Sequence, residues 1–79
     1  MLDVFEERHK DVVFLVEAND SMRRYMRKAV VLMKHIFGKY LQDEDRVALI
    51  KYSKNCHLRF PLTRKSHNTE QLRNQIVAL

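Results

Sequence analysis

The chain has 79 residues, of which 46% are hydrophobic and 32% are charged, and its formal net charge is +5. This composition is typical of a folded domain and excludes a disordered chain, and no stretch approaches the roughly 20 apolar residues of a membrane span. The single cysteine, Cys56, cannot form an internal disulfide, so we expect an intracellular protein, in the cytoplasm or the nucleus.

The first predicted strand runs from Asp11 to Ala18, after a lead-in segment at residues 1–10. Its nearly unbroken run of apolar, β-branched side chains predicts a strand buried on both faces, as in the middle of a parallel α/β sheet. Three short polar residues follow, Asn19, Asp20 and Ser21, and each is suited to cap the next helix. Because open α/β sheets bind their ligands at the carboxyl ends of the strands, we expect any site to lie at this turn.

A long amphipathic helix is predicted between Met22 and Leu41. Its apolar stripe has steps of three and four residues and consists of Met22, Tyr25, Met26, Ala29, Val30, Met33, Ile36, Phe37, Tyr40 and Leu41. The methionines of this stripe are predicted to pack in the core. The segment 21–41 contains no acidic residue, and its first turns carry a basic patch, Arg23, Arg24, Arg27 and Lys28. This patch is either a solvated outer face or a contact surface for phosphates or an acidic protein.

An acidic loop at 43–45, predicted to be exposed, precedes the second strand, which is predicted at Arg46–Ser53 and parallel to the first. Alternating apolar residues and Pro61 predict a third, antiparallel edge strand at Cys56–Leu62. Its packed face would be formed by Cys56, Leu58, Phe60 and Leu62. A last helix begins near Asn68, which forms a capping-box pattern with Gln71, and its apolar face holds Leu72, Ile76 and Leu79. The element order is therefore β-α-β-β-α, an α/β fold.

Catalytic motifs are missing from the sequence. The only glycine, Gly38, lies within the predicted long helix, which excludes a glycine-rich phosphate loop. Ser21 lacks the glycines of a nucleophile elbow, and Cys56 is predicted to face the core. The histidines do not have the spacing of a zinc site. We therefore expect a protein that is not an enzyme.

One constellation of polar residues remains at the turn after the first strand. Glu17, Asn19 and Ser21 alternate along the chain, so their oxygens can point toward one place. A carboxylate, an amide oxygen and a hydroxyl suit Mg²⁺ or Ca²⁺, with water or a ligand completing the coordination shell. The alternative is that these residues only cap the helix.

The segments VVFLVEANDSM, DRVALIKYSKNCHLRFPLT and EQLRNQIVAL together resemble the first half of a von Willebrand factor A domain, over residues 11–79. The resemblance implies half of a doubly wound, Rossmann-like sheet with the first strand central and the third strand at an antiparallel edge. In that family a D-x-S-x-S loop forms the metal-ion-dependent adhesion site, where an acidic residue of the partner protein completes the shell of a Mg²⁺ ion. The corresponding positions here are Glu17, Asn19 and Ser21, of which only Ser21 matches the pattern.

The resemblance also implies that residues 11–79 are a partial domain. In the complete family sheet a fourth strand, which would follow Leu79, flanks the first strand. Without it the first strand becomes an open apolar edge, which proteins usually avoid. Our hypothesis is that the chain is a fragment or is completed by a second chain.

These observations predict a protein-interaction module of the von Willebrand A type. It would dock its partner at Asn19, Asp20, Ser21 and Met22, with Mg²⁺ as the candidate cofactor. The alternative is a basic nucleic-acid-binding or structural subunit of a larger complex. That function would use Arg23, Arg24, Arg27, Lys28, Arg64 and Lys65. Because phosphate contacts weaken steeply with salt, the salt dependence of binding separates the two functions.

Overall fold

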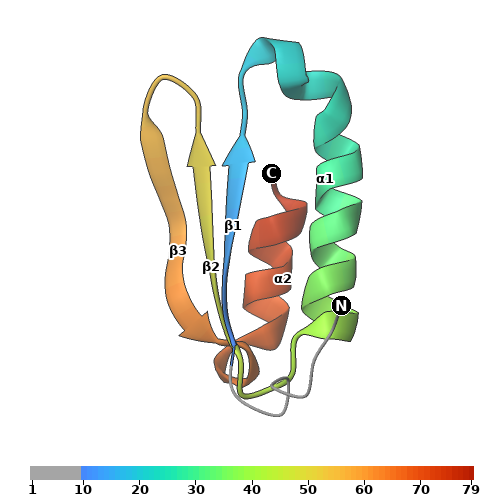
Figure 1. Ribbon diagram of the computed structural model, residues 1–79, viewed down its shortest axis with the longest axis vertical. Helices are drawn as coiled ribbons and strands as arrows, with labels where there is room; N and C mark the ends of the chain where they lie inside the picture. The colour runs from blue at the N-terminus through green and yellow to red at the C-terminus, as the bar shows by residue number, and fades with distance from the viewer. Residues whose placement is uncertain (1–9) are drawn as a thin grey trace.

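The structure, a computed structural model, describes residues 10–79, so the predicted lead-in segment lies outside the described residues apart from Lys10. The elements are β1 (Asp11–Glu17), α1 (Arg23–His35), β2 (Arg46–Tyr52), β3 (Cys56–Arg64) and α2 (Thr69–Val77). Short 3₁₀ turns at Asp20–Met22 and Lys65–His67 precede the helices, and α1 continues into a π-helical turn at Ile36–Tyr40. The predicted order β-α-β-β-α is confirmed (Figure 1).

The three strands form one mixed sheet in the order β1-β2-β3. β1 is parallel to β2, and β3 is antiparallel to β2, which confirms the third strand as an antiparallel edge. Within the described residues β2 is the middle strand and β1 forms the other edge. The sequence predicted this edge position for the first strand when the fourth strand of the family's sheet is not present.

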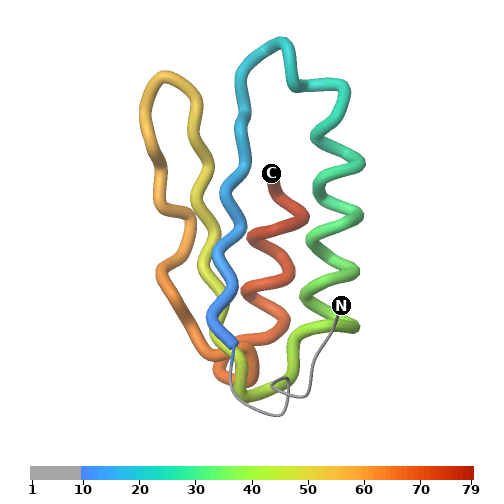
Figure 2. Tube along the Cα trace, in the orientation of Figure 1, coloured from blue at the N-terminus to red at the C-terminus, as the bar shows by residue number. Residues whose placement is uncertain are grey.

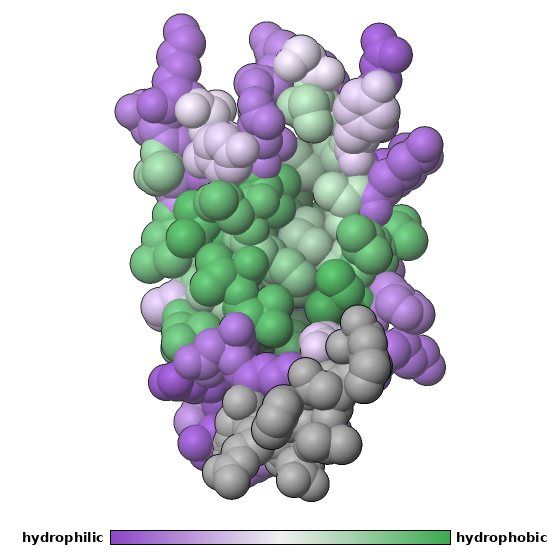
Figure 3. Space-filling view, in the orientation of Figure 1, coloured by the Kyte–Doolittle hydropathy of each residue, from purple (hydrophilic) through white to green (hydrophobic). Residues whose placement is uncertain are grey.

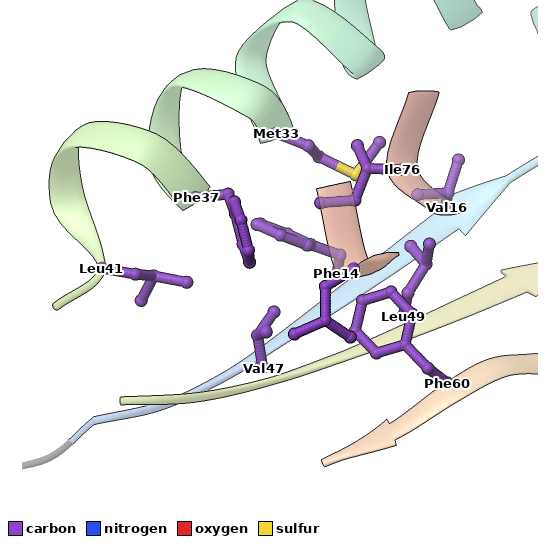
Figure 4. Close-up of a cluster of buried hydrophobic side chains, with 10 residues drawn as sticks. Phe14, Val16, Met33, Phe37, Leu41, Val47, Leu49, Phe60 and Ile76 are labelled. Atoms are coloured by element: carbon purple, nitrogen blue, oxygen red, sulfur yellow. The ribbon is translucent and has the colours of Figure 1, made fainter. Parts of the chain in front are cut away.

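Both helices pack on the same face of the sheet, so the molecule has two layers (Figures 1 and 2). The core lies between these layers and joins all five elements, as Figure 4 shows. Its buried side chains are Phe14, Val16, Met33, Phe37, Leu41, Val47, Leu49, Phe60, Leu72 and Ile76. The predicted stripe of the first helix is confirmed at Met33, Phe37 and Leu41, which are all buried in this core, whereas its members Tyr25 and Tyr40 are exposed.

The prediction that the first strand is buried on both faces is wrong for the described chain. Phe14 and Val16 are each 8% exposed and face the helices, whereas Val13 is 55% exposed and Leu15 62% exposed. Successive side chains of a strand point to opposite faces, and both helices cover the same one. The other face of β1 is therefore apolar and uncovered by any described element.

The predicted packed face of the third strand is only partly correct. Of its four residues, Phe60 alone is buried, and Cys56 is an exposed free thiol. Phe60 pairs with Leu49 and Leu58 pairs with Ile50, with register shifts on both sides of Leu49. Such shifts place an extra residue in one strand and change which side chains face the core.

Opposite the turn that follows β1, the amino-terminal ends of β1 and β2 are held by a buried carboxylate. Asp45 is only 1% exposed, so the predicted exposure of the acidic loop is wrong at this residue. Its carboxylate accepts hydrogen bonds from the backbone N–H groups of Lys10 and Gln42, both at 2.8 Å, and lies 2.9 Å from Lys10 Nζ. Together with Lys65 these residues form what we call the Asp45 cluster.

The pKa of Asp45 reflects two opposing influences. Burial is the largest single influence and raises the pKa, but the hydrogen bonds from Gln42 and Lys10 and the charge of Lys10 together outweigh it. The net pKa of Asp45 therefore lies below its ordinary value of 3.8. The cluster holds this carboxylate in its ionised form.

Lys65 is also buried in the Asp45 cluster. Its Nζ donates a hydrogen bond to the carbonyl oxygen of Leu41 at 2.7 Å, and its backbone N–H donates to the carbonyl oxygen of Asp45 at 2.8 Å. The proposed contribution of Lys65 to a nucleic-acid surface is therefore wrong, because its ammonium group is occupied inside the fold.

Candidate functional site

The candidate site lies at the carboxyl-terminal ends of the parallel strands β1 and β2. The turn after β1 and the β2–β3 hairpin reach the same end of the sheet (Figure 1). The backbone N–H of Ala18 donates to the carbonyl oxygen of Tyr52 at 2.8 Å, which fixes the exit of β1 against the end of β2. Open α/β sheets bind their ligands at this end of the strands.

The structure brings the three predicted site residues Glu17, Asn19 and Ser21 together in one hydrogen-bonded chain, which we call the loop network. The Asn19 side-chain amide donates to Glu17 Oε2 at 2.5 Å, and Ser21 Oγ donates to Asn19 Oδ1 at 2.7 Å. An ionised carboxylate only accepts hydrogen bonds, so the amide nitrogen must be the end that faces Glu17. All these groups remain accessible to solvent, since Asn19 and Ser21 are exposed and Glu17 is half-buried.

The predicted side-chain capping of the helices is wrong. Neither Asn19 before the first 3₁₀ turn nor Met22 before α1 makes a side-chain capping hydrogen bond, and Asn68 makes none before α2. The turn after β1 is closed by its backbone instead, with the Met22 N–H donating to the Asn19 carbonyl oxygen at 3.0 Å. The side chains of Asn19 and Ser21 are used within the loop network.

The arrangement of these side chains does not fit a bound Mg²⁺ ion. The protons of the Asn19 amide nitrogen point at the Glu17 carboxylate, where a cation would have to lie, and the Asn19 oxygen already accepts from Ser21. Over residues 10–79 no group of three or more histidine, cysteine or acidic residues is placed to hold a metal. Metal binding by Glu17, Asn19 and Ser21 therefore stays a prediction that requires the loop network to open.

Two shallow hollows flank the loop network. One is lined by Ala18, Asn19, Asp20, Arg23, Met26, Lys51 and Leu79, with a volume of about 220 Å³. The other is formed against the β2–β3 hairpin by Ala18, Asn19, Asp20, Ser53, Lys54 and Asn55. The site therefore includes cationic groups from β2 and the hairpin, at Lys51 and Lys54.

The sequence prediction did not include Lys51 and Lys54 in the site, although the sequence contains a signal for their position. Parallel strands end at the same edge of a sheet, so the end of the second strand belongs beside the end of the first. Lys51, the first charged residue after the apolar run of that strand, marks this end.

The predicted partner-binding residues and the basic patch are accessible. Asn19, Asp20 and Ser21 are exposed and Met22 is half-buried, while Arg23, Arg24, Arg27 and Lys28 are all exposed. The Arg24 guanidinium lies 5.9 Å from the centre of the Tyr25 ring. The patch therefore continues directly from the loop network along the outer side of α1.

The sequence profile of the von Willebrand factor type A domain matches residues 11–79 of the chain. Neither the search of the curated proteins nor that of the solved structures found a match. The matched range begins at the first residue of β1 and includes every described helix and strand. Over residues 10–79, no helix is both long and apolar enough to cross a membrane.

Proposed function

Because the chain belongs to the von Willebrand factor type A domain family, whose members generally act as protein-interaction modules, we propose that it docks a protein partner without catalysing a reaction. The docking face in this proposal is the loop Asn19–Met22, together with the two hollows beside it. The observation that carries the proposal is the loop network, which holds exposed side chains in one arrangement.

A docking loop that is already ordered binds its partner better than a flexible one. Free loops lose conformational entropy on binding, and each immobilised side chain costs about 0.5–1.5 kcal/mol. The hydrogen bonds from Asn19 to Glu17 and from Ser21 to Asn19 fix these side chains before any partner arrives. The loop network thus supplies the order that a metal ion supplies in the family's adhesion site.

The chemistry around the loop favours an acidic side chain of the partner. Arg23, Lys51 and Lys54 line the two hollows, with Asp20 as the acidic residue between them. An arginine and two lysines offer charge-assisted hydrogen bonds to a carboxylate. In this proposal they replace the metal ion as the electrostatic anchor, so docking needs no divalent cation.

The test is the binding of a purified partner, found by cross-linking at the loop, to the wild-type chain and two charge variants. Lys54→Glu reverses a charge at the hollow, and Lys39→Glu makes the same change at an exposed residue near the far end of α1. We expect Lys54→Glu to weaken binding about tenfold and Lys39→Glu to leave it unchanged. Equal losses in the two variants, or loss of binding in a chelator, would contradict the proposal.

The exposed basic patch favours nucleic-acid binding as a second candidate function. Arg23, Arg24, Arg27 and Lys28 carry no acidic neighbour on α1. Binding of a duplex or single-stranded oligonucleotide that falls steeply with salt, and that Arg27→Glu abolishes, would favour it.

We also propose an intracellular location, since the exposed free thiol of Cys56 suits a reducing compartment, and imaging of the tagged protein tests it.

A further inference from the structure

The side of helix α1 that faces away from the sheet carries a strip of exposed basic residues. Met33 and Phe37 are buried on the inner side of this helix. Because an α-helix has about 3.6 residues per turn, Lys28, Val31 and His35 lie on its opposite, outer side, and all three are exposed. The exposed basic residues on and beside this strip are Arg24, Arg27, Lys28, Lys34, His35 and Lys39. Together with Val31 they form what we call the outer basic face.

The outer basic face stays outermost however the sheet continues. Folded domains are built of packed layers, and both helices form one layer on one face of the sheet (Figure 1). Further elements of a layered domain lie beside α1 in the same layer or on the other face of the sheet, and not over the outer side of α1. Leu32 also lines the hollow between β1 and α1, so Val31 is the apolar residue that belongs to the outer basic face.

The positive charge of the outer basic face is not balanced within the described residues. Residues 21–41 contain no acidic residue. The two ion pairs in the part of the chain that the structure describes join Lys10 to Asp45 and Arg46 to Asp11, and neither includes a residue of α1. The face therefore extends a row of uncompensated basic groups over about four helical turns, and such a row attracts an anionic surface.

An exposed valine at the centre of the face distinguishes among anionic surfaces. Val31 is 62% exposed and lines a shallow hollow with Arg27, Lys28, Leu32 and His35. In Figure 3, hydrophilic side chains lie above and below a short hydrophobic stretch along the right side, where Figure 1 draws α1. A nucleic-acid backbone presents phosphates to the basic groups but no hydrocarbon to Val31. An anionic membrane presents both, because its acyl chains lie directly beneath its charged headgroups.

The shape of the face favours a membrane over a protein partner. The residues that contribute most to protein binding fill well-packed pockets from which water is excluded. The residues that line the hollow around Val31 all belong to α1, so this hollow is open and lacks the opposing wall of a pocket. A second copy of the chain would bring two basic helices together, and like charges oppose that association.

We propose that the outer basic face binds the surface of a membrane that contains anionic lipids. Its arginines and lysines contact the charged headgroups, and Val31 enters the boundary between headgroups and acyl chains. The long arginine and lysine side chains keep their charges at the headgroups while the helix approaches the membrane. Helix α1 then lies parallel to the membrane surface, and the loop Asn19–Met22 at the end of the sheet stays accessible. This inference therefore goes beyond docking at that loop and does not rest on it.

Vesicle sedimentation tests the proposal with the 79-residue chain. We expect the chain to sediment with vesicles of phosphatidylcholine mixed with phosphatidylserine, to stay in solution with phosphatidylcholine alone, and to be released by salt. Arg27→Glu should weaken binding about tenfold, because it reverses one charge of the face. Arg59→Glu, the matched control at an exposed residue of β3, should bind as the wild type does. Equal losses in the two variants, or equal binding to both kinds of vesicle, overturn the proposal.

A neutral substitution separates membrane binding from nucleic-acid binding. Val31→Gln removes the apolar group without changing the charge, so it should weaken vesicle binding about threefold and leave binding of a single-stranded oligonucleotide unchanged. Val13→Gln, the same change at a residue 55% exposed on the uncovered face of the sheet, should bind vesicles as the wild type does, and circular dichroism verifies the fold of both variants. The proposal is overturned if Val31→Gln binds vesicles as well as the wild type does. It is also overturned if the chain does not bind anionic vesicles, whether or not it binds the oligonucleotide.

Discussion

The two ends of the sheet each hold a carboxylate in a set of hydrogen bonds, but they differ in what surrounds it. At the amino-terminal end of β1 and β2, Asp45 is buried and accepts from Lys10 and Gln42, which lie in different segments of the chain. At the carboxyl-terminal end, Glu17 accepts from Asn19, only two residues away, in an exposed turn. The first set joins distant parts of the fold, and the second organises one loop.

This difference indicates a division of roles between the two ends. A buried carboxylate that lost its partners would remain desolvated, so the Asp45 cluster is essential to stability. The groups of the loop network are hydrated when they separate, so their hydrogen bonds add little to stability. The loop network can therefore change without unfolding the domain, as the proposed docking at this loop requires.

The largest loss of stability is expected from Asp45→Ala. The variant leaves the ammonium group of Lys10 and the Gln42 N–H without their acceptor, and we expect the free energy of unfolding to fall by about 3 kcal/mol. Urea denaturation followed by circular dichroism measures it, with Asp43→Ala in the same loop as the exposed control. A loss no greater than that of the control would remove the distinction between the two ends.

Acid should destabilise the fold through the same residue, Asp45. The pKa of Asp45 is lowered in the folded chain, so the unfolded chain takes up a proton more readily, and the contribution of Asp45 is fully present above about pH 3.8. It is lost as the pH falls from there through the folded pKa. The difference in unfolding free energy between wild type and Asp45→Asn should shrink over this range in urea titrations. A constant difference would show that the fold does not lower the pKa of Asp45.

A smaller effect is expected from Asn19→Ala at the other end of the sheet. The variant removes both hydrogen bonds of the loop network, yet we expect the unfolding free energy to fall by about 1 kcal/mol or less, because the freed groups are hydrated. Amide hydrogen exchange should rise in residues 18–22 and stay unchanged in β2. Global destabilisation as large as that of Asp45→Ala would instead give the loop a structural role.

The smallest effect is expected from Asp11→Asn. Arg46 donates two hydrogen bonds to Asp11, at 2.8 and 2.7 Å, and this carboxylate raises the pKa of the guanidinium by its hydrogen bond and its charge. Both side chains are exposed, so solvent screens the pair and the midpoint of urea unfolding should barely move. A marked loss of stability would show that charge pairing, and not burial, makes this end of the sheet important for the stability of the fold.

The elements of this fold could be predicted from the sequence because their signals are local. The stripe from Met22 to Leu41 and the apolar runs of the strands depend only on neighbouring residues. Which face of β1 is covered depends instead on where the helices pack, so the exposure of Val13 and Leu15 could not be predicted from the strand itself. The exposure of Leu58 depends on register shifts beside Leu49 that leave no pattern in the sequence.

The candidate site was predictable in position but not in chemistry. Strand-then-turn order placed Glu17, Asn19 and Ser21 at the carboxyl end of β1, where α/β sheets bind their ligands, and their role as a site stays a prediction. Whether an asparagine caps a helix or bonds its neighbours depends on side-chain geometry, which spacing does not determine. Asp45 looked like its exposed acidic neighbours because its partner Lys10 lies 35 positions away.

Isothermal titration of Mg²⁺ into the wild-type chain and into Asn19→Asp tests whether hydrogen bonds take the place of a metal ion in the loop network. If hydrogen bonds take the place of an ion in the loop network, the wild type should release no heat of binding. Asn19→Asp removes the amide donor and sets a second carboxylate beside Glu17, so the variant should gain Mg²⁺ binding. Binding by the wild type that Ser21→Ala abolishes would contradict the account and show a working metal site at Glu17, Asn19 and Ser21.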